Sequence, residues 1–211
     1  MPAPIVLALA LLAAPVPASK TEVVAGLQTW LDGTRTLELR FRQSLISGAL
    51  GTSVAESGRL YLERPGKIRW DYLEPEKKTA LLLGDRTELY LEDERTMSRG
   101  RLTGEQGLFP KLLAGGSRVE DLFAGTLVAT PETGGRGAYR LRLVPKADPG
   151  AASAVTLTLR APRFAIEEAE LLDESGNRTT YTFSDVKRNR KLPDAVFGFE
   201  PPPGTEIVDE R

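Results

Sequence analysis

The chain has 211 residues, enough for one domain or for one domain with an appendage. Its 28 lysines and arginines balance 29 aspartates and glutamates, so no excess of positive charge points to nucleic acid. The sequence has no histidine and no cysteine, which excludes thiol nucleophiles, disulfides and the usual zinc ligands and removes the commonest general base.

The N-terminal segment has the composition of a signal peptide. Residues 1–18 carry no charged side chain, and residues 5–14 are an apolar run. Ten residues of helix span only about 15 Å, half of the hydrocarbon core of a bilayer, which favours a signal peptide over a transmembrane anchor. Val16 and Ala18 are small residues where a signal peptidase reads them. We therefore expect a signal peptide at residues 1–18, cleaved near Ala18, and a single exported domain at residues 19–211.

The mature chain begins with a predicted amphipathic helix. Ser19 or Thr21 can cap it, Glu22 favours its first turn, and Asp32-Gly33 ends it. The apolar residues of this segment recur with helical spacing and share one face. They are Val23, Val24, Leu27, Trp30 and Leu31.

From residue 37 the apolar period changes to two, which predicts half-buried strands. We expect strands near 37–47, 56–64, 67–73, 79–83, 87–91 and 95–101, joined by turn sequences. In the third strand, Ile68 and Trp70 alternate with Arg69 and Asp71. This half of the chain reads as an antiparallel meander.

Residues 104–125 interrupt the strands with two predicted short helices. In the first, Leu108, Phe109, Leu112 and Leu113 have helical spacing; the second has a possible cap at Ser117. Strands are then predicted near 126–130, 138–144, 155–160, 166–172 and 178–186, with a hairpin turn at 173–177. Three consecutive prolines at 201–203 suit a sheet edge, because proline cannot donate to a ladder.

The predicted fold is mainly β: a curved antiparallel sheet of about 10–11 strands with helices packed on one side. Such a sheet holds either a packed core or a cavity for an apolar ligand. The sequence does not distinguish a filled interior from a hollow one.

No pattern of catalytic residues emerges. The sequence lacks a phosphate-binding loop and a nucleophile elbow, and a serine nucleophile would need a lysine or a terminal amine to activate it. The carboxylates Glu63, Asp71, Glu92 and Asp93 fall on polar strand faces or in turns. We therefore expect no enzyme, no metal site and no cofactor.

Four segments, in the same order, resemble the LolA family of periplasmic carriers of outer-membrane lipoproteins. The longest is "SGRLYLERPGKIRWDYLEPEKKTALLLGDRTELYLED", with a strand that ends in Arg-Pro and a following strand that contains Trp. The others are "FRQSLIS", the hairpin "LLDESGNRTTYTFSDVKRN" and the ending "FGFEPPPGTEIVD". The resemblance covers residues 21–209, but little beyond helical character matches from 104 to 136.

The resemblance implies an incomplete, half-open antiparallel β-barrel covered by a helical lid, with lid elements near 20–32 and 105–124. It assigns Arg64, the arginine of the Arg-Pro turn, to a latch that holds the lid shut, although the lid groups that it contacts cannot be named from sequence. It also implies a lipid-binding cavity or mouth. We expect that cavity to be lined by Ile68, Trp70, Leu62, Phe41, Leu27, Leu31, Leu108, Phe109, Leu112 and Leu113.

The implied function is that of a periplasmic carrier that binds the acyl chains of lipoproteins released from the inner membrane and delivers them to the outer membrane. The implied partners are acylated lipoproteins, an inner-membrane ABC-type exporter and an outer-membrane acceptor; we expect a monomer that does not bind nucleic acid.

Three alternative functions compete with that of a carrier. One is a periplasmic sensor of the same fold that binds a lipid or lipoprotein and signals to a membrane partner. The outer-membrane acceptor of the pathway is disfavoured by the lack of an N-terminal cysteine. An enzyme acting on lipid or glycan lacks an activatable nucleophile.

Overall fold

The computed structural model describes residues 18–102, 107–130, 138–147 and 154–210. The predicted signal peptide, apart from Ala18, lies outside the described residues. Within the described part of the chain, no helix is both long enough and apolar enough to cross a membrane.

The first helix, α1 (Lys20–Asp32), begins where the sequence predicts. The Glu22 backbone N–H donates to Ser19 Oγ at 3.3 Å, and the Ser19 backbone N–H donates to Glu22 Oε2 at 2.8 Å. This reciprocal capping box satisfies two amide groups that the helix leaves unpaired. The five predicted apolar residues of α1 are all buried, as its amphipathic pattern requires.

Six strands follow α1, then two short helices, and then the remaining strands. The first group is β1 (Thr36–Ile46), β2 (Ser53–Glu63), β3 (Lys67–Glu74), β4 (Lys78–Leu83), β5 (Arg86–Leu91) and β6 (Thr96–Arg101). The helices are α2 (Leu108–Ala114) and α3 (Val119–Leu122). The second group is β7 (Phe123–Ala129), β8 (Ala138–Pro145), β9 (Ala154–Arg160), β10 (Ala165–Leu172), β11 (Arg178–Arg188), the 3₁₀ turn η2 (Asp194–Phe197) and β12 (Glu206–Asp209).

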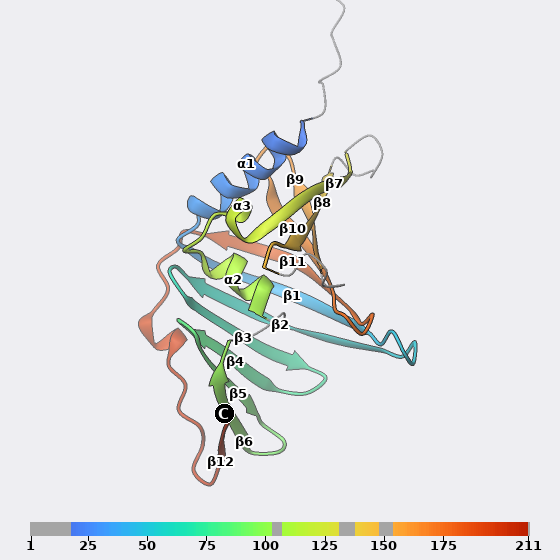
Figure 1. Cartoon of the computed structure of the whole chain (residues 1–211). Coiled ribbons are helices and arrows are strands. Elements are labelled where there is room, and N and C mark those ends of the chain that lie inside the picture. The colour runs from blue at the N-terminus through green and yellow to red at the C-terminus, as the bar shows by residue number, and fades with distance from the viewer. Residues whose placement is uncertain (1–17, 103–106, 131–137, 148–153, 211) are drawn as a thin grey trace, which may run out of the picture.

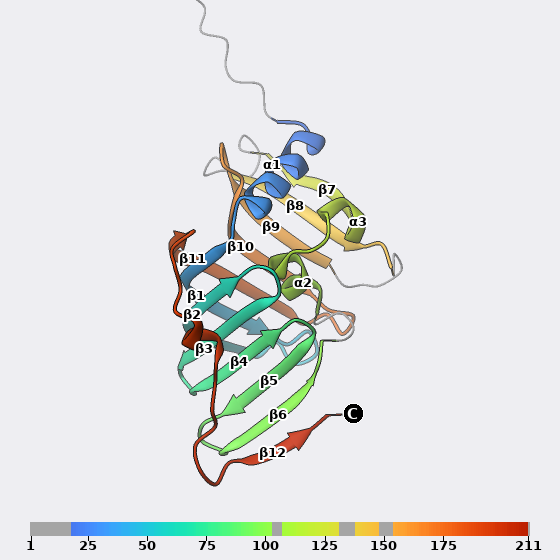
Figure 2. The same cartoon turned by 90° about the vertical axis from the view of Figure 1, so that its left-hand side faces the viewer.

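All the strands in the described residues belong to a single 12-stranded sheet in the order β12-β6-β5-β4-β3-β2-β1-β11-β10-β9-β8-β7. The long pairing of β1 with β11 joins the two halves, while β7 and β12 remain at opposite ends, so the sheet does not close. Figures 1 and 2 show the sheet curving around the helices. We call the face that packs against α1, α2 and α3 the inner face.

Three features differ from the sequence predictions. The sheet has 12 strands rather than 10 or 11, because β12 adds to β6 in parallel after a long return of the chain. Ser117 does not cap α3: Arg118 occupies the N-cap position and makes no side-chain cap bond. The helix has only four residues, because Phe123 already pairs with Pro145 in β8. The strand predicted from residue 126 therefore starts three residues earlier.

The segment 189–205, which we call the C-terminal strap, runs along the outer face of the sheet before β12 (Figure 1). The ring of Phe199 packs 5.1 Å from that of Tyr90, and Lys67 lies over the ring of Phe197 at 5.5 Å. Tyr90 and Lys67 belong to strands β5 and β3, so the strap spans several strands.

A glycine in β2 allows the inner face to pack densely. A Cβ atom at Gly58 would lie 2.0 Å from the Asp71 carbonyl oxygen and 3.0 Å from Cε1 of Phe41. Without that atom, the Phe41 ring lies 5.0 Å from the Tyr72 ring in an edge-on contact. The register also shifts beside this position, between Ser57 and Gly58.

Candidate functional site

Arg64 lies at the end of β2, next to the lid helix α1. Its Nη1 donates to the Leu31 carbonyl oxygen at 2.6 Å. That carbonyl is in the last turn of α1, where the helix dipole is negative, so a cation there is stabilised. Burial lowers the pKa of Arg64, the nearby Arg188 lowers it further, and Asp32 opposes both effects. Arg64 is thus a partly buried cation bound to lid backbone.

The turn after Arg64 also touches the second lid helix. The Gly66 N–H donates to the carbonyl oxygen of Ala114, the last residue of α2, at 3.2 Å. Gly115 then adopts a φ of +79°, and a Cβ atom at this position would lie 3.3 Å from Cδ of Arg64. The Arg-Pro turn is therefore in contact with both α1 and α2, which the sequence could not reveal.

A second arginine, which sequence reasoning missed, binds the same end of α1. Arg188, at the end of β11, donates from Nη2 to the Trp30 carbonyl oxygen at 3.3 Å. Its guanidinium lies 5.2 Å from the centre of the Trp30 ring, in a cation–π contact. Next to it, Asn189 donates from Nδ2 to the Gly33 carbonyl oxygen at 2.8 Å. The only sequence signal was the charged run at 187–191, which resembles ordinary surface.

The predicted cavity residues come together in one buried cluster. They are Leu27, Leu31, Phe41, Leu62, Ile68, Trp70, Phe109, Leu112 and Leu113. Leu108 begins α2, but its side chain lies outside the described residues. The cluster joins both lid helices to the inner face of the sheet, so the lid and the sheet share one apolar core.

Side chains fill the described interior where the lid meets the inner face. The pocket there, lined by Trp30, Leu113 and the inner-face residues Leu39, Leu60 and Phe183, has a volume of about 10 Å³. An apolar cavity of about 150 Å³ takes a benzene molecule, so this pocket is far too small for an acyl chain while the lid is in this position. The lid must move before this interior can hold an apolar ligand.

Helix α2 packs against two aromatic rings of β11. The Phe109 ring stacks 5.9 Å from the Tyr181 ring and 6.3 Å from the Phe183 ring. Stacked pairs of this kind contribute about 0.5–1.5 kcal/mol beyond the burial of their area. Phe109 therefore occupies space that opening of the lid would release.

The inner face becomes polar toward the C-terminal end of β3. Tyr72 donates from its hydroxyl group to Gln43 Oε1 at 2.9 Å, and its ring lies 4.4 Å from Lys78 Nζ. Lys78 in turn forms an ion pair with Glu56. Burial raises the pKa values of Tyr72 and Tyr181, so both phenols stay neutral at physiological pH.

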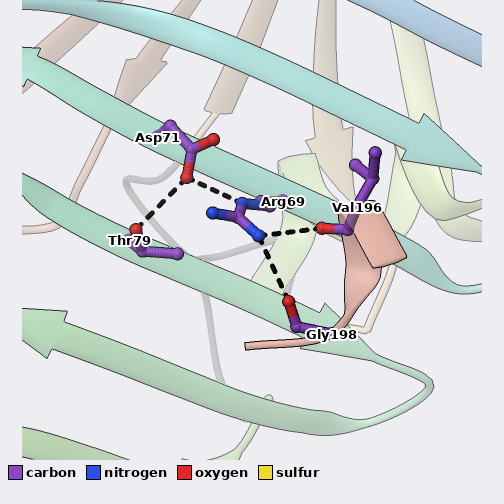
Figure 3. A network of polar contacts seen from close by, with 5 residues as sticks. All are labelled: Arg69, Asp71, Thr79, Val196 and Gly198. Carbon is purple, nitrogen blue, oxygen red and sulfur yellow. Dashed lines mark hydrogen bonds and ion pairs between the residues drawn. The ribbon is translucent and has the colours of Figure 1, made fainter. Parts of the chain in front are cut away.

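On the outer face, Arg69 anchors the C-terminal strap, as Figure 3 shows. Its Nη1 donates to the carbonyl oxygens of Val196 at 2.9 Å and Gly198 at 3.3 Å. Its Nε donates to Asp71 Oδ1 at 2.7 Å, and the same oxygen accepts from Thr79 Oγ1 at 3.2 Å. Asp71 is thus engaged in a structural network.

Two of the other candidate carboxylates also face cations. Glu63 pairs with Lys67 at 2.8 Å, and Glu92 pairs with Lys77 at 3.5 Å. Within the described ranges, no group of three or more acidic side chains is placed to hold a metal ion.

Comparisons with known proteins agree with this architecture. The family model described as "Outer membrane lipoprotein carrier protein LolA" matches residues 32–200. Outer-membrane lipoprotein carrier proteins from Methylococcus capsulatus and Chromobacterium violaceum are 30% and 33% identical. These alignments cover 92% and 93% of this chain and 90% and 91% of the two relatives.

A solved structure of an uncharacterized conserved protein from Thermus thermophilus shares the fold. Its TM-score is 0.55 at 15% identity, over 90% of this chain and 98% of that one. The family match spans strands β1 to β11, the Arg-Pro turn and both short helices, and the chain is a member of the LolA family of outer-membrane lipoprotein carrier proteins.

Proposed function

We propose that the protein is a periplasmic carrier that binds the acyl chains of lipoproteins released from the inner membrane and delivers them to the outer membrane. One observation carries this proposal: an apolar interior closed by two lid helices, which the Arg-Pro turn holds through single hydrogen bonds to backbone carbonyls. The names of its relatives, which are lipoprotein carriers, support the same role.

The energetics of the latch suit a carrier that must also release its cargo. One acyl chain of about sixteen carbons gains roughly 12 kcal/mol on leaving water, at about 0.8 kcal/mol per methylene. A hydrogen bond to a charged donor contributes only about 1.5–3 kcal/mol. The gain from burying an acyl chain therefore exceeds the strength of the latch bond, while the latch still biases the empty protein toward closure.

The proposed route begins with export and cleavage of residues 1–18. Cleavage between Ala18 and Ser19 would preserve the capping box, because Ser19 and Glu22 both stay in the mature chain. We further propose that cargo comes from an inner-membrane ABC-type exporter and passes to an outer-membrane acceptor. The mature domain, residues 19–211, would act as a monomer and carry out no covalent step.

A release assay tests the carrier function. The purified mature protein is incubated with inner-membrane vesicles that contain a triacylated lipoprotein and an ATP-driven exporter. A soluble one-to-one complex of protein and lipoprotein, formed only with ATP, is the expected result. Hydrolysed lipoprotein would indicate an enzyme instead, and lipoprotein that remains with the vesicles would reject the carrier function.

The latch makes a prediction of its own. Arg64→Leu should still accept lipoprotein but transfer it poorly to outer-membrane acceptors, because the bond that favours the empty closed state is lost. By the strength of that bond, transfer should slow by about tenfold to a hundredfold. Transfer is measured as lipoprotein recovered in acceptor membranes over time.

Arg42→Leu is the matched control, because Arg42 is exposed on the neighbouring strand β1. It should transfer at the wild-type rate. Wild-type transfer by Arg64→Leu would show that Arg64 is not a latch.

A further inference from the structure

Trp70 carries a hydrogen-bond donor that the closed protein does not use. Its side chain belongs to the buried cluster and is only 9% exposed. The indole nitrogen Nε1 has almost no contact with solvent and meets no acceptor in the part of the chain that the structure describes. A buried donor without a partner destabilises a protein by about 1–3 kcal/mol, so its retention calls for an explanation.

The surroundings of Trp70 offer hydrocarbon instead of an acceptor. Across the inner face it lies between Leu60 in β2 and Ala80 in β4, and Ile68 precedes it on the same face of β3. An indole N–H can only donate, so it needs an oxygen from elsewhere. In this setting the natural source is a ligand that enters the interior.

The inner face of β3 changes in polarity along its length. Ile68 is fully buried among apolar side chains, Trp70 adds an N–H group, and Tyr72 adds a hydroxyl group. Successive residues on one face of a strand lie about 6.6–6.8 Å apart. This gradient matches a molecule with a hydrocarbon tail, then a carbonyl group, then a polar head.

We propose that the indole N–H of Trp70 binds a carbonyl oxygen of the ligand, in the ester or amide that joins an acyl chain to its head group. The hydrocarbon then lies toward Ile68 and the lid, and the head group toward Tyr72 and the ion pair of Lys78 with Glu56. This inference rests on the proposed carrier function and deepens it: the interior fixes how far the acyl chain enters as well as burying it.

Two lysolipids that differ only in the carbonyl group test this site. 1-Palmitoyl-lysophosphatidylcholine has an ester carbonyl, and its 1-O-hexadecyl analogue has an ether in that place. Displacement of a fluorescent fatty-acid probe gives the affinity of each. The wild-type protein should bind the ester about five to ten times more tightly, the effect of one neutral hydrogen bond.

Trp70→Phe keeps an aromatic ring and removes the N–H. It should lower the affinity for the ester alone and bring the ratio close to one. Tyr90→Phe is the matched control: it removes an aromatic donor from the outer face, where Tyr90 packs against Phe199, and should keep the wild-type ratio.

A spectroscopic readout on the wild-type protein needs no variant. The chain has two tryptophans, so the ¹⁵N-labelled protein has two indole N–H signals to follow. The Trp70 signal should move downfield with the ester lysolipid and not with the ether lysolipid.

The outcomes separate this inference from the function on which it rests. Equal affinity for ester and ether in the wild-type protein, or an unchanged ratio in a folded Trp70→Phe protein, would overturn the carbonyl site and leave the carrier function intact. Failure of both lysolipids to displace the probe, together with a negative release assay, would count against the carrier function itself.

Discussion

Two arginines hold the C-terminal end of α1 through its backbone carbonyls. Arg64 binds Leu31 and Arg188 binds Trp30, and within the described residues neither forms an ion pair with a carboxylate. Each guanidinium is attracted by the helix dipole, but the two cations also repel each other, and Arg188 lowers the pKa of Arg64. The repulsion between the two arginines thus partly offsets their attraction to the end of α1, which suits the proposed opening of the lid.

Arg188 should stabilise the closed protein on its own account. Arg188→Gln removes a cation–π contact of about 0.5–2 kcal/mol and weakens one hydrogen bond, so the free energy of unfolding should fall by roughly 1–2 kcal/mol. Urea denaturation measures it. Arg40→Gln is the control, because the ion pair of Arg40 with Asp185 is 66% exposed on both sides and should be worth at most about 1 kcal/mol. Equal losses in the two variants would contradict a special role for Arg188.

At this scale the family resemblance identified Arg64 as a residue that meets the lid, but the groups that it contacts could not be predicted. Arg64 was identified through the Arg-Pro turn, a local motif. Its acceptor is 33 positions away, and the bond from Arg188 to Trp30 spans 158 positions. No local pattern encodes such pairings, because they depend on how the finished sheet places β2 and β11 beside α1.

At the scale of the elements, the C-terminal strap is attached to the sheet by side-chain contacts and by one short strand pairing. Strand β12 is exposed at all four positions and, among the described strands, pairs only with β6. Arg95 donates to the Pro203 carbonyl oxygen at 2.9 Å, and Arg69 holds the carbonyls of Val196 and Gly198 farther back. Two arginines and one short parallel pairing therefore hold the strap together with the ring contacts of Phe197 and Phe199.

Arg69→Met should loosen the strap and leave the core folded. Loss of the hydrogen bonds from Arg69 should make the amides of β12 and η2 exchange about tenfold faster or more, because local opening becomes less costly. The amides of β1 and β11, in the middle of the sheet, should keep their protection. Amide hydrogen exchange monitored by mass spectrometry gives both values. Unchanged exchange in β12 would show that Arg69 does not anchor the strap.

The elements that the sequence predicted are those with a local signal. Ser19 and Glu22 define the start of α1, and the alternation from Leu37 to Phe41 defines β1, whose bounds are close to those predicted. β12 has no such signal: its four residues are exposed, and it pairs in parallel with a strand far away in the chain. α3 is shorter than its helical pattern suggests, because Phe123 already pairs with β8.

For the whole molecule, the open sheet and the filled interior act together. The sheet leaves its edges unjoined, yet the space inside it is taken by side chains of its own lid, such as Phe109 and Leu113. A ligand therefore competes with the lid for the same apolar surface. Any change that weakens the contact between lid and sheet should lower stability and raise affinity at once, because the ligand displaces a less stable closed state.

Phe109→Ala tests this coupling. Phe109 is 2% exposed, so its truncation should lower the free energy of unfolding by roughly 3–5 kcal/mol. The same variant should bind an acyl probe more tightly, by about tenfold, because the stacking on Tyr181 and Phe183 no longer opposes entry.

Met97→Ala is the matched control: Met97 is fully buried in β6 but lies outside the cluster that joins lid and sheet. It should lose about 2–5 kcal/mol of stability with no gain in affinity. Urea denaturation and probe titration measure the two quantities, and a Phe109→Ala protein that is less stable and also binds more weakly would show that Phe109 is part of the binding surface and does not compete with the ligand.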